Sequence, residues 1–178
     1  MDLDHFLERI VKLSTQHKRF YHFTDKKNLP LIREHGLLST SQLKARGLYD
    51  RVVTGGDANS LESDRLKGTD QFVCLCLTDS HPMEYVARTG DRKLNPIYLG
   101  IDPEVIKLPG VMLTSAPSNQ NGVERMEPTI GLDEFDLPVI YTWMDWKDAK
   151  IMDRLKIARK YEILIPTNIE SRHILKGL

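Results

Sequence analysis

Apolar residues recur at helical spacing near both ends of the chain. Residues 2–14 carry them every three or four positions, at Leu3, Phe6, Leu7, Ile10, Val11 and Leu13. This period predicts an amphipathic helix within residues 1–17. Residues 146–160 have a similar period, with Ile151, Leu155 and Ala158 on one face and basic residues on the other. We therefore expect a second amphipathic helix late in the chain.

Apolar or alternating runs between these helices predict short strands, at 19–24, 71–79, 95–102, 111–116 and 160–166. The first strand leads into a helix that either Asp25 or Asn28 can cap. Pro30 fits the first turn of this helix, and Gly36 is a good terminator. A further short helix is expected to start near Ser80. The first strand therefore delivers its side chains to the start of a helix.

Two stretches lack a clear period. Residues 39–70 are polar and contain several glycines, with one short helical candidate at about 41–46, and residues 117–136 are also predicted to be a loop. A loop as long as 39–70 inside a compact domain is usually either functional or partly disordered, and we take it as a candidate active-site loop region. The expected architecture is one α+β domain spanning residues 1–178, with short strands in the middle and at the end and helices at the start and before the last strand.

The composition is that of an ordinary globular domain, with 178 residues, 40% hydrophobic and 28% charged. No apolar run is long enough to cross a membrane, and the first residues are too charged for a secretory signal, so we expect a cytoplasmic protein. The two cysteines, Cys74 and Cys76, are expected on opposite faces of a strand. This interpretation disfavours a disulfide or a CxxC metal site.

Charge is balanced in total but uneven along the chain. Lysine and arginine together number 25, and so do aspartate and glutamate, which argues against a histone-like binder of polyanions. Basic residues nevertheless predominate in 18–46, and acidic residues predominate in 102–136. The basic segments are either ordinary solvated surface or, if they share a face with the late basic helix, a phosphate-binding side.

Polar residues interrupt two apolar strands, far apart in the sequence. His22 and Thr24 lie within an aromatic strand just before a helix start, where free N–H groups can bind an anion. Glu162 lies within the apolar run 160–166, where a carboxylate is unfavourable unless it is paired, exposed or used in chemistry. Taken alone, each residue is better explained by a structural role, an outward-pointing Glu162 and a partly buried, satisfied His22. Neither residue alone justifies the assignment of a catalytic site.

The segment FYHFTDKKNLPLIREHGLLS together with KYEILIP resembles the DarT-type ADP-ribosyltransferases. These are enzymes of toxin–antitoxin and phage-defence systems that move ADP-ribose from NAD onto a nucleic-acid base. The matching positions are His22, Thr24, Asn28, Leu29, Ile32, Gly36 and Leu37 at the front, and Glu162, Leu164 and Ile165 near the end. Pro82 and Met83 match a turn between them. The chain departs from the family at Tyr161, where the family has alanine, and most of all in 39–70.

The resemblance implies an ADP-ribosyltransferase-like fold, with central split or mixed β-sheets and flanking helices, and it assigns roles to these residues. Glu162 would stabilise the oxocarbenium character that develops as the nicotinamide–ribose bond breaks, and would help to deprotonate or position the acceptor. His22 would bind the ribose on the adenosine side, and the backbone of Phe23 would pair with the nicotinamide carboxamide. Thr24 and Asn28 would hold ribose or phosphate groups. NAD is a co-substrate in this scheme, and no metal is needed.

The family carries an active-site arginine in the region that corresponds to 39–70. Arg65 is the closest counterpart, a residue that would neutralise the pyrophosphate or the departing charge, and Arg51 is the alternative. An aromatic side chain should stack on nicotinamide. Tyr49, Tyr85 and Tyr98 are the candidates, and the sequence does not choose among them.

The acceptor implied by the resemblance is single-stranded DNA or RNA. Residues 143–160 contain Trp143, Trp146, Lys147, Lys150, Arg154, Lys156, Arg159 and Lys160. Such aromatic and basic residues can stack bases and follow a backbone, although the tryptophans can equally anchor the helix. Two alternatives remain at this point, a protein-modifying enzyme and a non-catalytic domain that binds NAD or ADP-ribose. A toxin of this kind would have an antitoxin partner, either a macrodomain hydrolase or an inhibitory protein.

Overall fold

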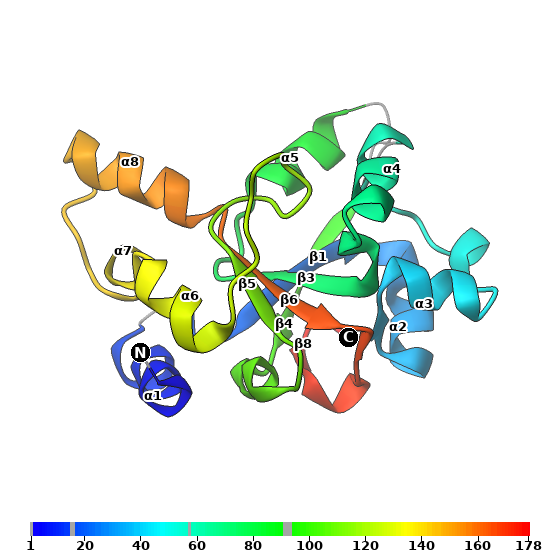
Figure 1. The fold of residues 1–178 in the computed structure, drawn as a ribbon, viewed down its shortest axis with the longest axis horizontal. Helices are drawn as coiled ribbons and strands as arrows, with labels where there is room; N and C mark the ends of the chain where they lie inside the picture. The colour runs from blue at the N-terminus through cyan, green and yellow to red at the C-terminus, as the bar shows by residue number, and fades with distance from the viewer. Residues whose placement is uncertain (1, 15–16, 57, 91–93) are drawn as a thin grey trace.

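The computed structural model describes residues 2–14, 17–56, 58–90 and 94–178. Helices and strands alternate irregularly along this part of the chain, as Figure 1 shows. The helices are α1 Leu3–Leu13, α2 Leu29–His35, α3 Thr40–Ala45, α4 Ala58–Leu66, α5 Pro82–Thr89, α6 Pro128–Glu134, α7 Leu137–Tyr141 and α8 Ala149–Ala158. The strands are β1 Phe20–Asp25, β2 Leu37–Leu38, β3 Phe72–Cys76, β4 Pro96–Ile101, β5 Met112–Thr114, β6 Glu162–Pro166, β7 Asn168–Ile169 and β8 Ile174–Lys176.

The described strands form a six-stranded sheet in the order β5-β6-β3-β1-β4-β8 and a small sheet of β2 and β7. The α+β class with flanking helices is confirmed. Mixed pairing is not found among the described strands, because every pair is antiparallel. In this order β6, which comes from the end of the chain, is two strands away from β1, which comes from its beginning. Only β3 separates the predicted Glu strand from the predicted His strand.

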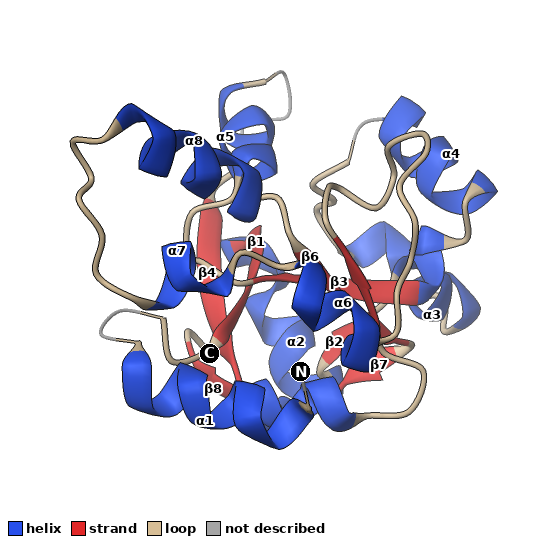
Figure 2. Cartoon of the chain, turned by 60° about the vertical axis from the view of Figure 1, so that its left-hand side comes forward, coloured by secondary structure: helices blue, strands red, loops and turns tan. Residues whose placement is uncertain are grey.

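Pairing on the two sides of β3 is unequal. β3 pairs with β6 along its whole length, from Phe72–Pro166 to Cys76–Glu162. With β1 it has one described register pair, Tyr21 with Cys76, whereas β1 pairs with β4 over six residues. Figure 2 shows β3 running across the direction of β1 and β4. The sheet therefore opens between β1 and β3, which is the split that the family resemblance implied.

The N-terminal helix α1 covers one side of the sheet. Asp2 caps it by accepting a hydrogen bond from the backbone N–H of His5. Phe6 and Ile10, on its apolar stripe, are fully buried, and each contributes about 2–3 kcal/mol by leaving water. α1 packs against α6 and α7, and Figure 1 shows the three helices at the same side of the molecule. This packing leaves the opposite side, toward α2, α3 and α4, for a cavity.

Two regions predicted to be loops contain helices. The segment 39–70 holds α3, close to the candidate at 41–46, and also α4, which was not expected. α4 has no buried residue and hence no apolar stripe to reveal it in the sequence. The segment 117–136 holds α6, where Pro128 stands in the first turn and Gly131 fits closely against Leu113 and Met126. Pro128 thus begins a helix and Gly131 packs it, within a segment that was predicted to be a loop.

The prediction that Cys74 and Cys76 face opposite ways was wrong. Side chains two residues apart on a strand point to the same face, because the side-chain period of a strand is two. Both cysteines lie on β3 and both are free thiols. Cys76 is paired in register with Glu162. The two thiols therefore belong to the surroundings of that carboxyl group.

Candidate active site

A cavity of about 290 Å³ lies where the sheet opens between β1 and β3. Its volume is at the lower end of the range for small-molecule sites. His22 and Glu162 both line it, together with Phe23, Thr24 and Asn28 from the front of the chain. Residues far apart in the sequence thus meet in one cavity, as the sequence analysis required. Other lining residues come from the loop 52–56, from α4 and from the loop that contains Ser118.

The imidazole of His22 is fixed in one tautomer. Its Nδ1 lies 2.9 Å from the carbonyl oxygen of Cys74. A carbonyl oxygen only accepts, so Nδ1 carries the proton and donates it, and Nε2 is an acceptor. Burial lowers the pKa of His22, which keeps the ring neutral. The site therefore offers an acceptor suited to a hydroxyl group, such as that of a ribose.

The backbone of Phe23 points into the gap between β1 and β3. The carbonyl oxygen of Tyr21 accepts a hydrogen bond of 3.3 Å from the thiol of Cys76, so it faces β3. Backbone groups alternate between the two sides of a strand, and Phe23, two residues further on, faces the same side. β3 has diverged from β1 at that point. The N–H and C=O of Phe23 are therefore placed for an amide ligand.

Asn28 holds the wall of the cavity through its side-chain amide. Its Nδ2 donates to the hydroxyl of Thr24 at 3.1 Å and to the carbonyl oxygen of Val53 at 2.8 Å. Its Oδ1 accepts from the N–H of Val53 at 2.8 Å. Both amide hydrogens are thus used by the chain itself. The geometry gives Asn28 the task of fixing the loop 52–56, and it leaves the Thr24 hydroxyl proton available to a ligand.

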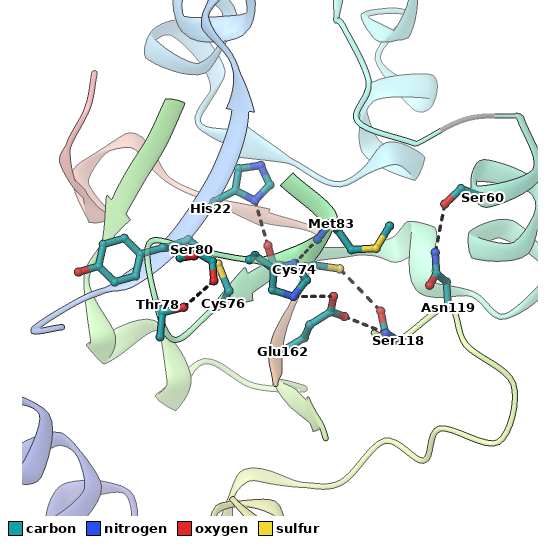
Figure 3. A network of polar contacts seen from close by, with 12 residues as sticks. His22, Ser60, Cys74, Cys76, Thr78, Ser80, Met83, Ser118, Asn119 and Glu162 are labelled. Atoms are coloured by element: carbon teal, nitrogen blue, oxygen red, sulfur yellow. Dashed lines mark hydrogen bonds and ion pairs between the residues drawn. The ribbon is translucent and has the colours of Figure 1, made fainter. Parts of the chain in front are cut away.

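Glu162 stands at the start of β6 with its carboxyl group buried. One oxygen, Oε2, accepts a hydrogen bond of 2.9 Å from the backbone N–H of Ser118, and Figure 3 shows this contact. Burial raises the pKa of Glu162 to about 7, and the nearby carboxyl of Asp64 acts in the same direction. The hydrogen bonds from Ser118 oppose this shift because they favour the charged form. Such a carboxyl group can both accept and release a proton near neutral pH.

The loop that carries Ser118 is attached to α4. The carbonyl oxygen of Asn119 accepts hydrogen bonds from the hydroxyl of Ser63 and from the ammonium of Lys67. The amide of Asn119 donates to the hydroxyl of Ser60 at 3.2 Å, which Figure 3 also shows. α4 therefore determines where the N–H that binds Glu162 lies. Neither Ser118 nor Asn119 was anticipated, because a backbone donor leaves no signal in the sequence.

The structure does not bring the predicted arginines into the cavity. Arg65 is on the exposed side of α4, where its Nε and Nη2 donate to the carboxylate of Glu62 at 2.9 and 2.7 Å. Arg51 is exposed at the end of a 3₁₀ turn. The described lining includes neither residue, nor any other lysine or arginine. A basic side chain that neutralises a pyrophosphate must therefore come from outside the described lining of the cavity.

The three tyrosines named as stacking candidates also lie outside the described lining. Tyr85 is 61% exposed, with Arg88 over its ring, and Tyr49 lies beneath Lys44. The hydroxyl of Tyr98 accepts a hydrogen bond from the backbone of the residue that caps α5. Aromatic rings that do line the cavity are those of Phe23 and Phe72. An aromatic on an apolar strand is usually core, which is why sequence reasoning passed them over.

No group of three or more metal-binding side chains occurs within the described parts of the chain. Across the same residues, no helix combines the length and the apolar character that crossing a membrane would take.

Solved structures with the same fold include Thermosipho africanus DarTG in complex with ADP-ribose. That match has a TM-score of 0.64 at 17% identity, and covers 88% of this chain and 42% of that one. Thermus sp. 2.9 DarT in complex with ADP-ribosylated ssDNA matches with a TM-score of 0.63 at 13% identity, over 92% of this chain and 81% of that one. The same Thermus protein in complex with NAD+ matches with a TM-score of 0.58 at 13% identity, over 90% and 81%. The fold is therefore that of DarT-type ADP-ribosyltransferases.

The family model for DarT, described as ssDNA thymidine ADP-ribosyltransferase, matches residues 21–176. The chain belongs to the DarT family. This confirms the predicted family and enzyme class, and it selects single-stranded DNA over RNA or protein as the acceptor of the family. No curated protein matches the sequence.

Proposed function

We propose that this chain transfers ADP-ribose from NAD to thymidine in single-stranded DNA, with the reaction centred on Glu162. The observation that carries the proposal is the cavity between β1 and β3, which joins Glu162 to His22 in a chain of the DarT family. The Thermus relative has been solved with NAD+ and with ADP-ribosylated ssDNA, the co-substrate and the product of such a reaction.

The residues present fit NAD. The acceptor Nε2 of His22 suits a ribose hydroxyl, and the backbone of Phe23, open toward the gap, suits the nicotinamide carboxamide. Thr24 has a hydroxyl proton to donate to a ribose or phosphate oxygen. Phe23 or Phe72 can supply an aromatic surface for the nicotinamide ring, in place of Tyr85 or the other two tyrosines. Asn28 contributes by holding the loop 52–56 in place.

Transfer breaks the nicotinamide–ribose bond and forms a bond between the same ribose carbon and the base. The electron pair of the broken bond stays on nicotinamide, which leaves as a neutral molecule. The attacking atom of the base gives up a proton, and the carboxylate of Glu162 is the group placed to accept or orient it. The ionised form of Glu162 also stabilises positive charge on the ribose carbon.

Arg65 remains the proposed source of positive charge, with Arg51 as the alternative. Arg65 lies on α4, the helix that also holds the loop with Ser118. A small rotation of α4 would therefore change the direction of the Arg65 side chain and the position of the Ser118 N–H. Glu62 competes for the guanidinium in the structure. Arg65→Ala should therefore lower kcat/KM, whereas Glu62→Ala should not. If Arg51→Ala lowers kcat/KM and Arg65→Ala does not, the roles of the two arginines are exchanged.

The surface around α8 is the proposed DNA-binding surface. Trp143 is 82% exposed and Trp146 41%, so neither anchors the helix in the core. Arg154 is held by Asp136 in a bidentate pair and Lys156 by Asp153, whereas Lys147, Lys150 and Lys160 form no ion pair among the described residues. α8 leads directly into β6 and Glu162. Stacking on the tryptophans and contact with these lysines would bring a strand toward the cavity.

Labelled NAD tests the proposal directly. The purified chain is incubated with a single-stranded oligonucleotide that contains thymidine, with the same sequence in which every thymidine is replaced by cytidine, with RNA and with protein. Label should appear only on the first oligonucleotide, and the variant Glu162→Gln should transfer none. Label on RNA or protein alone, or transfer that persists in Glu162→Gln, would overturn the proposal.

The setting in the cell is part of the same proposal. A DNA-modifying enzyme that consumes NAD would act in the cytoplasm, where both substrates occur. It would be toxic, and an antitoxin, either a macrodomain hydrolase or an inhibitory protein, would counter it. The Thermosipho match, in which this chain spans 42% of a protein named DarTG, supports a toxin–antitoxin setting. Growth inhibition on expression that Glu162→Gln relieves is the matching observation.

A further inference from the structure

His81 is buried beside Glu162, and one of its nitrogens has no partner. The residue precedes α5, at the turn that contains Pro82 and Met83, and 3% of its side chain is exposed. Its Nε2 lies 4.0 Å from Oε1 of Glu162. Within the described chain no hydrogen-bond partner reaches this nitrogen. A buried polar atom without a partner is rare in folded proteins and calls for a physical explanation.

The rest of the His81 residue is held in place. Its Nδ1 accepts a hydrogen bond of 3.3 Å from the backbone N–H of Met83, which caps α5. Its own backbone N–H donates to the hydroxyl of Tyr98 at 2.7 Å. The ring stacks on Phe23 with a centroid distance of 6.2 Å and an interplanar angle of 22°. Helix, strand and aromatic neighbour together fix the direction in which Nε2 points.

These contacts also fix the proton. Because Nδ1 accepts, the proton of the neutral ring is on Nε2, the nitrogen nearest Glu162. Burial lowers the pKa of His81 to about 4, so the ring stays neutral throughout the ordinary assay range. Nε2–H is therefore a preoriented donor directed at a carboxyl oxygen. The other carboxyl oxygen is already bound by the N–H of Ser118.

Capping alone does not explain a histidine at this position. Serine, threonine, aspartate and asparagine cap helices well, and they need no second nitrogen. Histidine adds a donor that reaches beyond the cap toward Glu162. A separation of 4.0 Å is too long for a hydrogen bond, but catalytic hydrogen bonds are often long in the ligand-free enzyme and tighten when substrate binds.

We propose that His81 is a positioning residue for Glu162, whose Nε2–H donates to Oε1 and, with the Ser118 N–H on Oε2, clamps the ionised carboxylate toward the reacting ribose. This inference rests on the proposed function and names a residue beyond the family positions that carry it. No proton is transferred to or from His81. Its contribution is to orient the carboxylate and to favour the charged form.

Several other titratable groups face Glu162 and must be kept unchanged in a test. Cys74 and Cys76 approach from β3, and Asp64 approaches from α4. Burial and the charge of Glu162 both raise the pKa of Cys74, so it is a neutral thiol at neutral pH. Asp64 raises the pKa of Glu162, in the direction opposite to the effect of a donor. A change confined to His81 isolates its own contribution.

Two substitutions separate capping from positioning. In His81→Asn the side-chain oxygen takes the place of Nδ1 and keeps the cap, but nothing replaces Nε2–H. In His81→Gln the amide N–H reaches the place of Nε2. We expect His81→Asn to lower kcat about ten- to a hundredfold with little change in the KM for NAD, and His81→Gln to restore much of the loss.

The pH dependence provides a second readout that does not require activity. The carboxyl carbon of Glu162 is titrated by ¹³C NMR in the wild type and both variants, each with carba-NAD+ bound, so that the hydrogen bond that tightens on binding is present. His81→Asn should move the titration midpoint about one pH unit higher, because it removes a donor to the charged form, and His81→Gln should move it back. Equal kcat and equal midpoints in wild type and His81→Asn would overturn the inference. If the wild type transfers nothing to DNA but the midpoint shifts, the proposed function fails and the clamp stands.

Discussion

The buried carboxyl group of Glu162 makes the stability of the fold depend on pH. Its pKa is raised from 4.5 to about 7 on folding, mainly by burial. A group whose pKa is higher in the folded state stabilises the protein fully below its unfolded pKa, and this stability is lost as pH rises through the folded pKa. For Glu162 the loss extends from about pH 4.5 to pH 7 and amounts to about 3 kcal/mol at pH 8.

Glu162→Gln removes this dependence, because the amide is neutral at every pH and its oxygen can still accept from the Ser118 N–H. We expect the variant to be within about 1 kcal/mol of wild type at pH 5 and about 3 kcal/mol more stable at pH 8. It should also be inactive at both values. This result would mean that the charged carboxylate of Glu162 lowers the free energy of unfolding, a cost that is frequent at catalytic residues.

Urea unfolding followed by far-UV circular dichroism at pH 5 and pH 8 measures both differences. The control is Glu124→Gln, which removes an exposed carboxylate outside the cavity. The control should show no stabilisation that grows with pH. If wild type and Glu162→Gln differ by the same amount at both pH values, the carboxyl is not held in a neutral buried environment and the reasoning is refuted.

Three further substitutions test residues that line the cavity. Asp64→Asn should move the rising limb of the kcat/KM profile to lower pH, because Asp64 raises the pKa of Glu162; an unchanged limb contradicts this. Asn28→Leu should cost about 3 kcal/mol in urea unfolding and weaken NAD binding by calorimetry, because it unpairs both backbone groups of Val53. Gly36→Ala should lower the stability by more than about 2 kcal/mol in thermal unfolding, since φ is +75° and the new Cβ would meet the carbonyl oxygen of β7; an unchanged Tm would refute this.

The parts of the fold that the sequence predicts are those with an apolar period. α1, α8, β1 and β6 all carry one, and each lies within a few residues of its expected place. α4 could not be found in this way, because none of its residues is buried. It is held instead by polar contacts of Ser63 and Lys67 with a distant loop, and such contacts depend on the whole fold.

The candidate site divides in a similar way. Side chains at the ends of two recognisable strands, His22 and Glu162, were predicted and line one cavity. The Ser118 N–H is a backbone group and has no sequence signal. His81 had one, a histidine at a helix cap where smaller polar residues are preferred, but its meaning required the 4.0 Å approach to Glu162. Arg65 was predicted from a resemblance in the region where the chain departs most from its family, and there the structure pairs it with Glu62.

Incomplete strand pairing creates the site. β3 pairs with β6 along its whole length, and this pairing sets Glu162 beside Cys76. With β1, in contrast, β3 has one described register pair. Beyond that pair the His22 imidazole, and not the backbone, bonds to the carbonyl oxygen of Cys74. Further backbone pairing would add ordinary hydrogen bonds worth about 1 kcal/mol each, but it would occupy the Phe23 backbone and close the cavity. The described sheet lacks these hydrogen bonds between β1 and β3, where β1 and the carboxylate of Glu162 line the same cavity.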